Sequence, residues 1–172
     1  TEILATKSLL ALNKKETYSM LSDIFYASGT KIKSKKLIIK LLHHFIHEEV
    51  LTLIFTAMDS SHLSLIDEAS NALIKVSKNQ NLNGNHLDKI EELVLQLAQR
   101  AFQLHLFKST IINDQYSMLI KDHVEYDLSI LVPVLLKLGT LKEPEIPIEK
   151  YIHYVKSNDK ELLPLVLELV ES

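Results

Sequence analysis

The sequence predicts an all-α fold in which antiparallel helix pairs stack on one another. Apolar residues recur with the 3.6-residue period of a helix through most of the chain. Glycine and proline, which mark tight hairpins, supply only 3 and 4 of the 172 residues. No window alternates apolar and polar residues in the manner of a half-buried strand. Long helices joined by short polar turns fit this composition.

Capping and turn residues place the helix boundaries. We expect Ser34 to cap the third helix and the Asn-rich segment 79–85 to form the clearest loop. Pro133 is expected to kink or break the helix that contains it, and Gly139 to end that helix. Residues 109–123 are expected to be helical in part. The predicted helices are 6–12, 16–27, 34–46, 48–58, 63–76, 87–107, 124–138, 148–156 and 159–170.

Two leucines lie at the centres of predicted apolar faces. Leu41 belongs to the stripe that runs from Ile38 to Phe45, and polar side chains occupy the opposite side of that helix. Leu73 has the same position in the helix predicted at 63–76. We expect both leucines to be buried between adjacent helices.

The segment 48–73 has the layout of a structural repeat. An apolar helix is followed by a turn at Asp59 and by a second helix that carries Ala69 and Ala72. Small residues let two helices approach closely, and a pair of this size must stack on neighbours to bury its apolar face. The segment resembles a HEAT repeat, although Asp67 stands where that family usually has arginine. The resemblance implies a HEAT- or armadillo-like α-solenoid of about four units.

The C-terminal segment 149–172 carries a second resemblance. Leu167-Glu168-Leu169 and the final acid Glu171 are similar to a segment of bacterial membrane proteins in which HEAT repeats follow a transporter domain related to the ATP/ADP translocases of the major facilitator type. Asn158 replaces the glycine of that segment. The resemblance implies a cytoplasmic appendage tethered to the inner membrane through a parent protein, with the transport residues outside this chain.

The two ends of the chain lead to an expectation about its origin. The start at Thr1 has neither an initiator methionine nor the pattern of a signal peptide, and the end at Ser172 is equally abrupt. We therefore expect residues 1–172 to be a single helical-repeat domain cut from a larger protein.

Composition argues against several classes of function. The chain has no cysteine, and therefore neither a disulfide framework nor a thiolate metal site. The net charge is −3, and Arg100 is the only arginine among 19 basic residues, so we expect no nucleic-acid partner. The longest apolar run, 130–136, contains Pro133 and is far shorter than the roughly 20 residues of a membrane span. Contact with a membrane is expected only through the parent protein.

Histidines give the nearest approach to a metal site. His43 and His47 lie four residues apart, a spacing at which two imidazoles on one helical face can share a divalent ion. A zinc-protease helix would need glutamate at the position of His44, and no third ligand is identifiable. The two alternatives are a solvated polar face and a small-ligand- or metal-responsive regulatory bundle.

A run of lysines is the candidate interaction surface. Residues 1–42 hold eight lysines against three acidic residues, a local charge of +5. Such a run attracts an anionic lipid surface or an acidic partner, or is simply solvated. If it forms one exposed face, its members are Lys31, Lys33, Lys35, Lys36 and Lys40.

No catalytic arrangement is visible in the sequence. Asp88, Glu91 and Glu92 begin a helix, where carboxylates complement the helix dipole. The three glycines stand apart, so they form no phosphate loop, and no nucleophile motif occurs. We therefore expect a non-catalytic scaffold or protein-interaction module without a cofactor, whose partner is another protein or a neighbouring domain of the same chain.

Overall fold

Every secondary-structure element that the structure describes is a helix. The computed structural model describes residues 13–45, 48–111 and 115–142, and no strand occurs within these ranges. The all-α prediction is confirmed for this part of the chain. The helices expected at 6–12, 148–156 and 159–170 lie outside the described residues.

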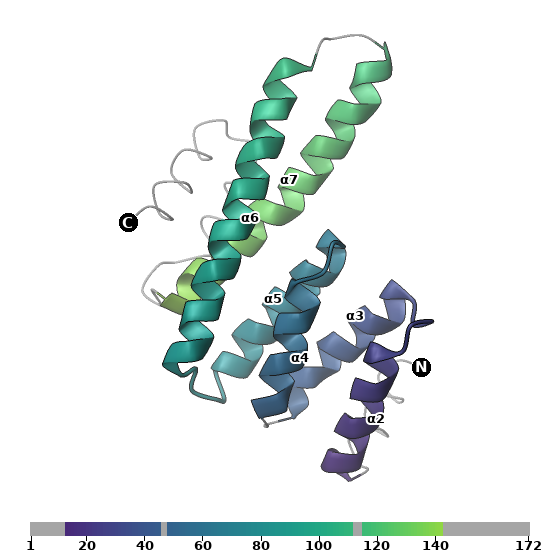
Figure 1. The fold of residues 1–172 in the computed structure, drawn as a ribbon, viewed down its shortest axis with the longest axis vertical. Helices are drawn as coiled ribbons and strands as arrows, with labels where there is room; N and C mark the ends of the chain where they lie inside the picture. Colours follow the sequence, from purple (N-terminus) through teal and green to yellow (C-terminus); the bar gives the residue numbers. More distant parts are fainter. Residues whose placement is uncertain (1–12, 46–47, 112–114, 143–172) are drawn as a thin grey trace. The chain divides into compact units, whose positions relative to one another are not determined.

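The chain divides into two compact units, Thr1–Asn81 and Leu82–Ser172. In the first unit, α4 and α5 form an antiparallel pair around the turn at Asp59, and α3 packs along α5 (Figure 1). The elements of this unit are α2 (Lys14–Tyr26), α3 (Ile32–Leu41), the 3-10 helix η1 (Leu42–His44), α4 (Glu48–Met58) and α5 (Leu63–Ser77).

The core of the first unit is centred on α4. Most of this helix is buried, as expected for a helix that is apolar on nearly all sides. Ala69 and Ala72 of α5 are buried, and such small side chains allow close helix packing. Leu73 is 0% exposed, which confirms that prediction. Leu41 is only half-buried, and Leu42, the next residue along, takes the core position instead.

Hydrogen bonds of the Tyr18 and Tyr26 hydroxyls link α2 to α4, to Glu49 at its beginning and to Thr56 farther along. The Tyr18 hydroxyl donates to the backbone carbonyl of Glu49 at 2.7 Å, and its ring lies 6.2 Å from that of Phe45. Leu21 and Phe25 of α2 are buried. These contacts position α2 beside the lysine-rich helix α3, with which it also packs.

The beginning of α3 differs from the prediction. The sequence predicts Ser34 as the cap, but the helix begins at Ile32, and Lys31 occupies the N-cap position without a side-chain capping bond. The backbone N–H groups of Ser34 and Lys35 donate to the Lys31 carbonyl at 2.9 and 3.1 Å. The helical bonds therefore start before Ser34, which lies within the first turn.

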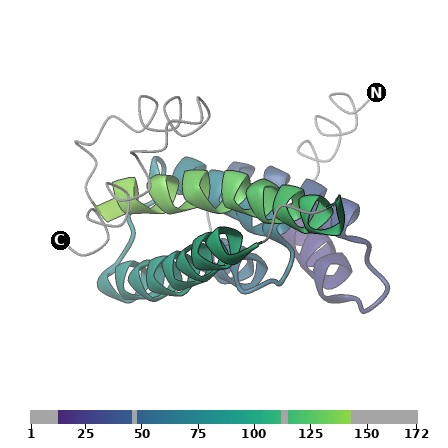
Figure 2. The same cartoon turned by 90° about the horizontal axis from the view of Figure 1, so that it is seen from above.

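The second unit is a helical hairpin of α6 (Gly84–Thr110) and α7 (Gln115–Lys142), which run side by side (Figures 1 and 2). Asn83 caps α6 by accepting a hydrogen bond from the His86 N–H, and the His86 side chain accepts one from the Asn83 N–H in return. This reciprocal capping ends the loop at Asn83, two residues before the predicted end.

Of the two outcomes expected at Pro133, a kink or a break, the break does not occur, and the expected helix end at Gly139 is wrong. Helix α7 passes through both Pro133 and Gly139 and continues to Lys142. Proline lacks the N–H that would bond to the carbonyl four residues earlier. Buried residues on both sides of Pro133, among them Leu131 and Leu138, offset that cost by tertiary packing. No helix of the described part is long and apolar enough to cross a membrane.

Candidate interaction surfaces

Helix α3 presents a basic stripe on its outer side. Lys33 and Lys40 are exposed and lie seven residues apart, so two helical turns bring them to the same side. Leu37, 49% exposed, lies between them, and the half-buried Lys36 flanks them. We name Lys33, Leu37 and Lys40, with Lys36 at their edge, the α3 stripe.

The five candidate lysines do not share one face. Lys35 is two residues from Lys33, which places it roughly 200° around the helix. Its ammonium group lies 5.0 Å from the centre of the Phe25 ring on α2, a cation–π contact that holds it toward that helix. Lys31 is exposed at the N-cap. The helical period therefore divides the lysine run into two sides, and Lys33, Lys36 and Lys40 form the outer one.

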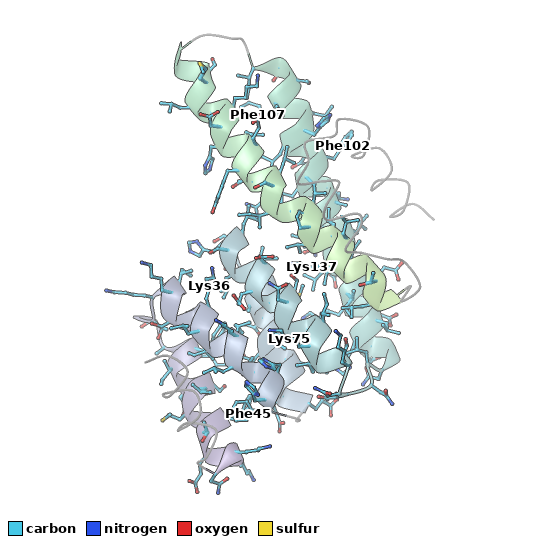
Figure 3. The ribbon with its side chains drawn as sticks, turned by 180° about the vertical axis from the view of Figure 1, so that it is seen from behind. Lys36, Phe45, Lys75, Phe102, Phe107 and Lys137 are labelled. Atoms are coloured by element: carbon cyan, nitrogen blue, oxygen red, sulfur yellow. The ribbon has the colours of Figure 1, made fainter. Side chains whose placement is uncertain are left out.

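A histidine pair follows the α3 stripe at the end of the helix. The His43 Nδ1–H donates to the Lys40 carbonyl at 2.8 Å, and the ring centroids of His43 and His44 are 3.9 Å apart. Partial burial lowers the pKa of His43, and the charges of His44 and of Lys75 on α5 lower it further, against the opposing effect of the Lys40 hydrogen bond. Figure 3 shows Lys75 on α5 and Lys36 on α3.

The histidine metal site gains no further ligand from the described residues. His47 lies outside them, and no group of three or more histidine, cysteine, aspartate or glutamate side chains within the described ranges is placed to hold a metal ion. The Nδ1 atom of His43 is occupied by the Lys40 carbonyl, which leaves Nε2 as its possible ligand atom. The metal-responsive bundle therefore stays a prediction.

Acidic side chains occur on the two helices that pack against α3. Helix α5 carries Asp67 and Glu68, both partly exposed. Helix α2 carries the exposed Asp23. Helix α3 itself contains no acidic residue.

A second surface, which is not among the surfaces predicted from the sequence, lies on α6. Leu95, Phe102 and Leu106 are 54, 46 and 49% exposed, and their spacing of seven and four residues places them on one side of the helix. The side chains that α6 buries are a different set: Ile90, Leu93, Leu97, Ala98 and Ala101. Helix α6 thus exposes apolar side chains on a second side, where the exposed Gln99 lies between Leu95 and Phe102. We name Leu95, Phe102 and Leu106 the outer α6 stripe.

The spacing of the outer α6 stripe is present in the sequence. The apolar residues that α6 buries form a longer stripe, and that longer stripe dominates the apolar pattern of this helix. Figure 3 shows Phe102 of this stripe, together with Phe107 farther along the helix. Phe107 is also largely exposed, as are Met118 and Leu119 of α7. Large exposed apolar side chains are therefore concentrated on the half of the hairpin nearest its turn.

An ion pair links α6 and α7 in the same half of the hairpin. The Lys108 Nζ atom lies 2.8 Å from a carboxylate oxygen of Glu125. Its hydrogen bond is the main reason that the pKa of Glu125 is below its ordinary value. Both side chains are substantially exposed, so the pair contributes little to stability.

Comparison with known proteins does not place the chain in a family. No family model, no curated protein and no solved structure matches it.

Proposed function

We propose that this chain is a non-catalytic helical-repeat scaffold that binds another protein or a neighbouring part of its own chain. The outer α6 stripe is the observation that carries the proposal. A helix that ends a monomeric fold exposes a polar outer side, whereas a helix inside a stacked array is apolar on two sides. Helix α6 has the second pattern, with Leu95, Phe102 and Leu106 about half exposed.

The first unit supports the same proposal through its local geometry. The α4–α5 pair has the short turn at Asp59 and the buried alanines Ala69 and Ala72 that a HEAT-like unit needs for close packing. The α6–α7 hairpin is a second antiparallel pair. We propose that such pairs stack as a solenoid, because each needs a neighbour to cover its remaining apolar side.

The relation to translocase-type transporters stays a prediction. It rests on residues 149–172, which lie outside the described part of the chain. The open reading frame of the parent protein tests it, because a cytoplasmic appendage of a transporter requires preceding apolar segments of about 20 residues each.

Site-specific photo-crosslinking tests the scaffold proposal. A photoreactive amino acid is placed at Phe102 on the outer α6 stripe, and in a control protein at Gln103, an exposed polar position about 100° around the same helix. Both proteins are produced in the native cell and irradiated. We expect a discrete product from position 102 and none from position 103. Replacing Leu95 and Leu106 by glutamine should abolish the product while far-UV circular dichroism stays unchanged.

The mass of the product identifies the occupant of the stripe. An intramolecular product shows that another helix of the chain covers α6, as a repeat array requires, and a product with another protein shows a binding partner. Equal products from positions 102 and 103, or none from either, would refute the proposal.

A further inference from the structure

We propose that the α3 stripe binds an acidic peptide segment of a partner protein. The inference rests on the interaction role proposed above and names a partner chemistry for a surface separate from α6. Carboxylates of the peptide would meet Lys33 and Lys40, Lys36 would contribute from the edge, and an apolar residue of the peptide would cover Leu37.

Charge complementarity is the first argument. Helix α3 has no acidic residue, and residues 1–42 carry eight lysines against three acids in a chain whose net charge is −3. A local positive surface on an otherwise acidic chain directs negatively charged partners to that place. Specific recognition of phosphate favours the planar, bidentate guanidinium group of arginine. The ammonium group of lysine acts as a point charge and is suited to attracting carboxylates.

The spacing of the stripe is the second argument. Lys33 and Lys40 are separated by two helical turns, a rise of about 10 Å. Leu37, 49% exposed, lies between them and gives the surface one apolar contact. A peptide helix whose carboxylates repeat at seven-residue spacing, with one apolar residue between them, matches this pattern, as in other helix-recognition surfaces.

The small number of lysines on the outer side of α3 favours a peptide over a lipid surface. Attachment to an anionic membrane takes a cluster of about four to eight basic side chains, and the outer side of α3 offers Lys33, Lys36 and Lys40. Lys35 does not add to them, because its ammonium group contacts the Phe25 ring. A short acidic peptide needs no more than these three lysines.

Charge reversal on the full chain tests the inference. The probe is a fluorescent 14-residue peptide with glutamate at the matching positions and one central leucine, measured by anisotropy at low ionic strength, where such contacts are least screened. The test variant is K33E/K40E. The control variant, K14E/K15E, reverses two exposed lysines at the start of α2 and changes the net charge equally. Vesicles of phosphatidylserine and of phosphatidylcholine form a second arm.

We expect K33E/K40E to weaken peptide binding about tenfold or more and K14E/K15E to change it less than about threefold. A peptide with glutamine in place of glutamate should not bind. Equal weakening by both variants would overturn the inference, because net charge alone would then explain binding. Absence of peptide binding would also overturn it, and phosphatidylserine binding without peptide binding would assign the stripe to lipid. Circular dichroism of both variants confirms that they are folded, and none of these outcomes changes the crosslinking test on α6.

Discussion

Replacing Leu73 by alanine should destabilise the first unit far more than the same change at Leu41. Leu73 is 0% exposed in the centre of the α3–α4–α5 core, whereas Leu41 is half-buried. The substitution removes three carbon atoms, worth about 2.5 kcal/mol in transfer from water, and leaves a cavity beside close-packed helices. We therefore expect a loss of about 2–5 kcal/mol at Leu73 and about 1 kcal/mol or less at Leu41.

Urea unfolding followed by far-UV circular dichroism measures the free energy of unfolding of both variants. The slope of that free energy against urea concentration shows whether the variants expose the same surface on unfolding. Because the chain has two compact units, hydrogen exchange of the α5 amides serves as a measure of stability within the first unit alone. Faster exchange confined to the first unit is expected for Leu73→Ala. If both variants lose the same stability to within about 0.5 kcal/mol, the assignment of the core face of α3 and α5 is wrong.

Four further substitutions test individual contacts. Asn83→Ala should cost about 1 kcal/mol by removing the α6 cap, and His86→Ala should cost less because it removes only the returning hydrogen bond; thermal unfolding compares them. The pKa of His43 in the folded chain lies below its unfolded value of about 6.5, so the unfolded chain binds the proton first as the pH falls. The free energy of unfolding should therefore decrease as the pH drops below that value. The melting temperature of His43→Gln should lack this decrease at low pH. Lys108→Ala should change stability by less than about 1 kcal/mol, since its pair with Glu125 is exposed, and added salt should remove even that difference.

Local chemistry made the α4–α5 pair predictable. The expected ranges, 48–58 and 63–76, agree with Glu48–Met58 and Leu63–Ser77 to within one residue. Acidic residues in the first turn of α4 and the polar turn after Met58 fix these limits within a few residues of sequence. The same explanation covers the confirmed burial of Leu73.

Tertiary packing explains why α7 continues through Pro133, where the sequence predicts a kink or a break. A proline in the middle of a helix usually marks a break, and in α7 it does not, because Leu131 and Leu138 are buried on either side of it. The sequence shows the local cost of Pro133 but not the packing that offsets it. Leu41 and Leu42 differ in burial because Leu42 is four and three residues after the buried Ile38 and Ile39, so the core side of α3 passes through Leu42.

The candidate surfaces were predictable to different degrees. The separation of Lys33 and Lys35 follows from helical geometry alone, once the helix is known to begin at Ile32. The contact of Lys35 with Phe25 does not, because it depends on how α2 packs on α3. The exposure of Phe102 could not be predicted, since an apolar residue on a long helix is usually covered.

The hairpin of the second unit is longer than the core that holds it together. At 27 residues α6 extends about 40 Å, yet its last buried side chain is Ala101, and the first one recorded on α7 is Val124. None of the described side chains at 102–110 or 117–123 is buried. Because this outer half buries none of its described side chains, its local opening should require less free energy than opening of the inner half. A molecule that binds this outer half therefore also determines how much of the hairpin remains helical. Its binding free energy adds to the stability of the helical turns that it contacts.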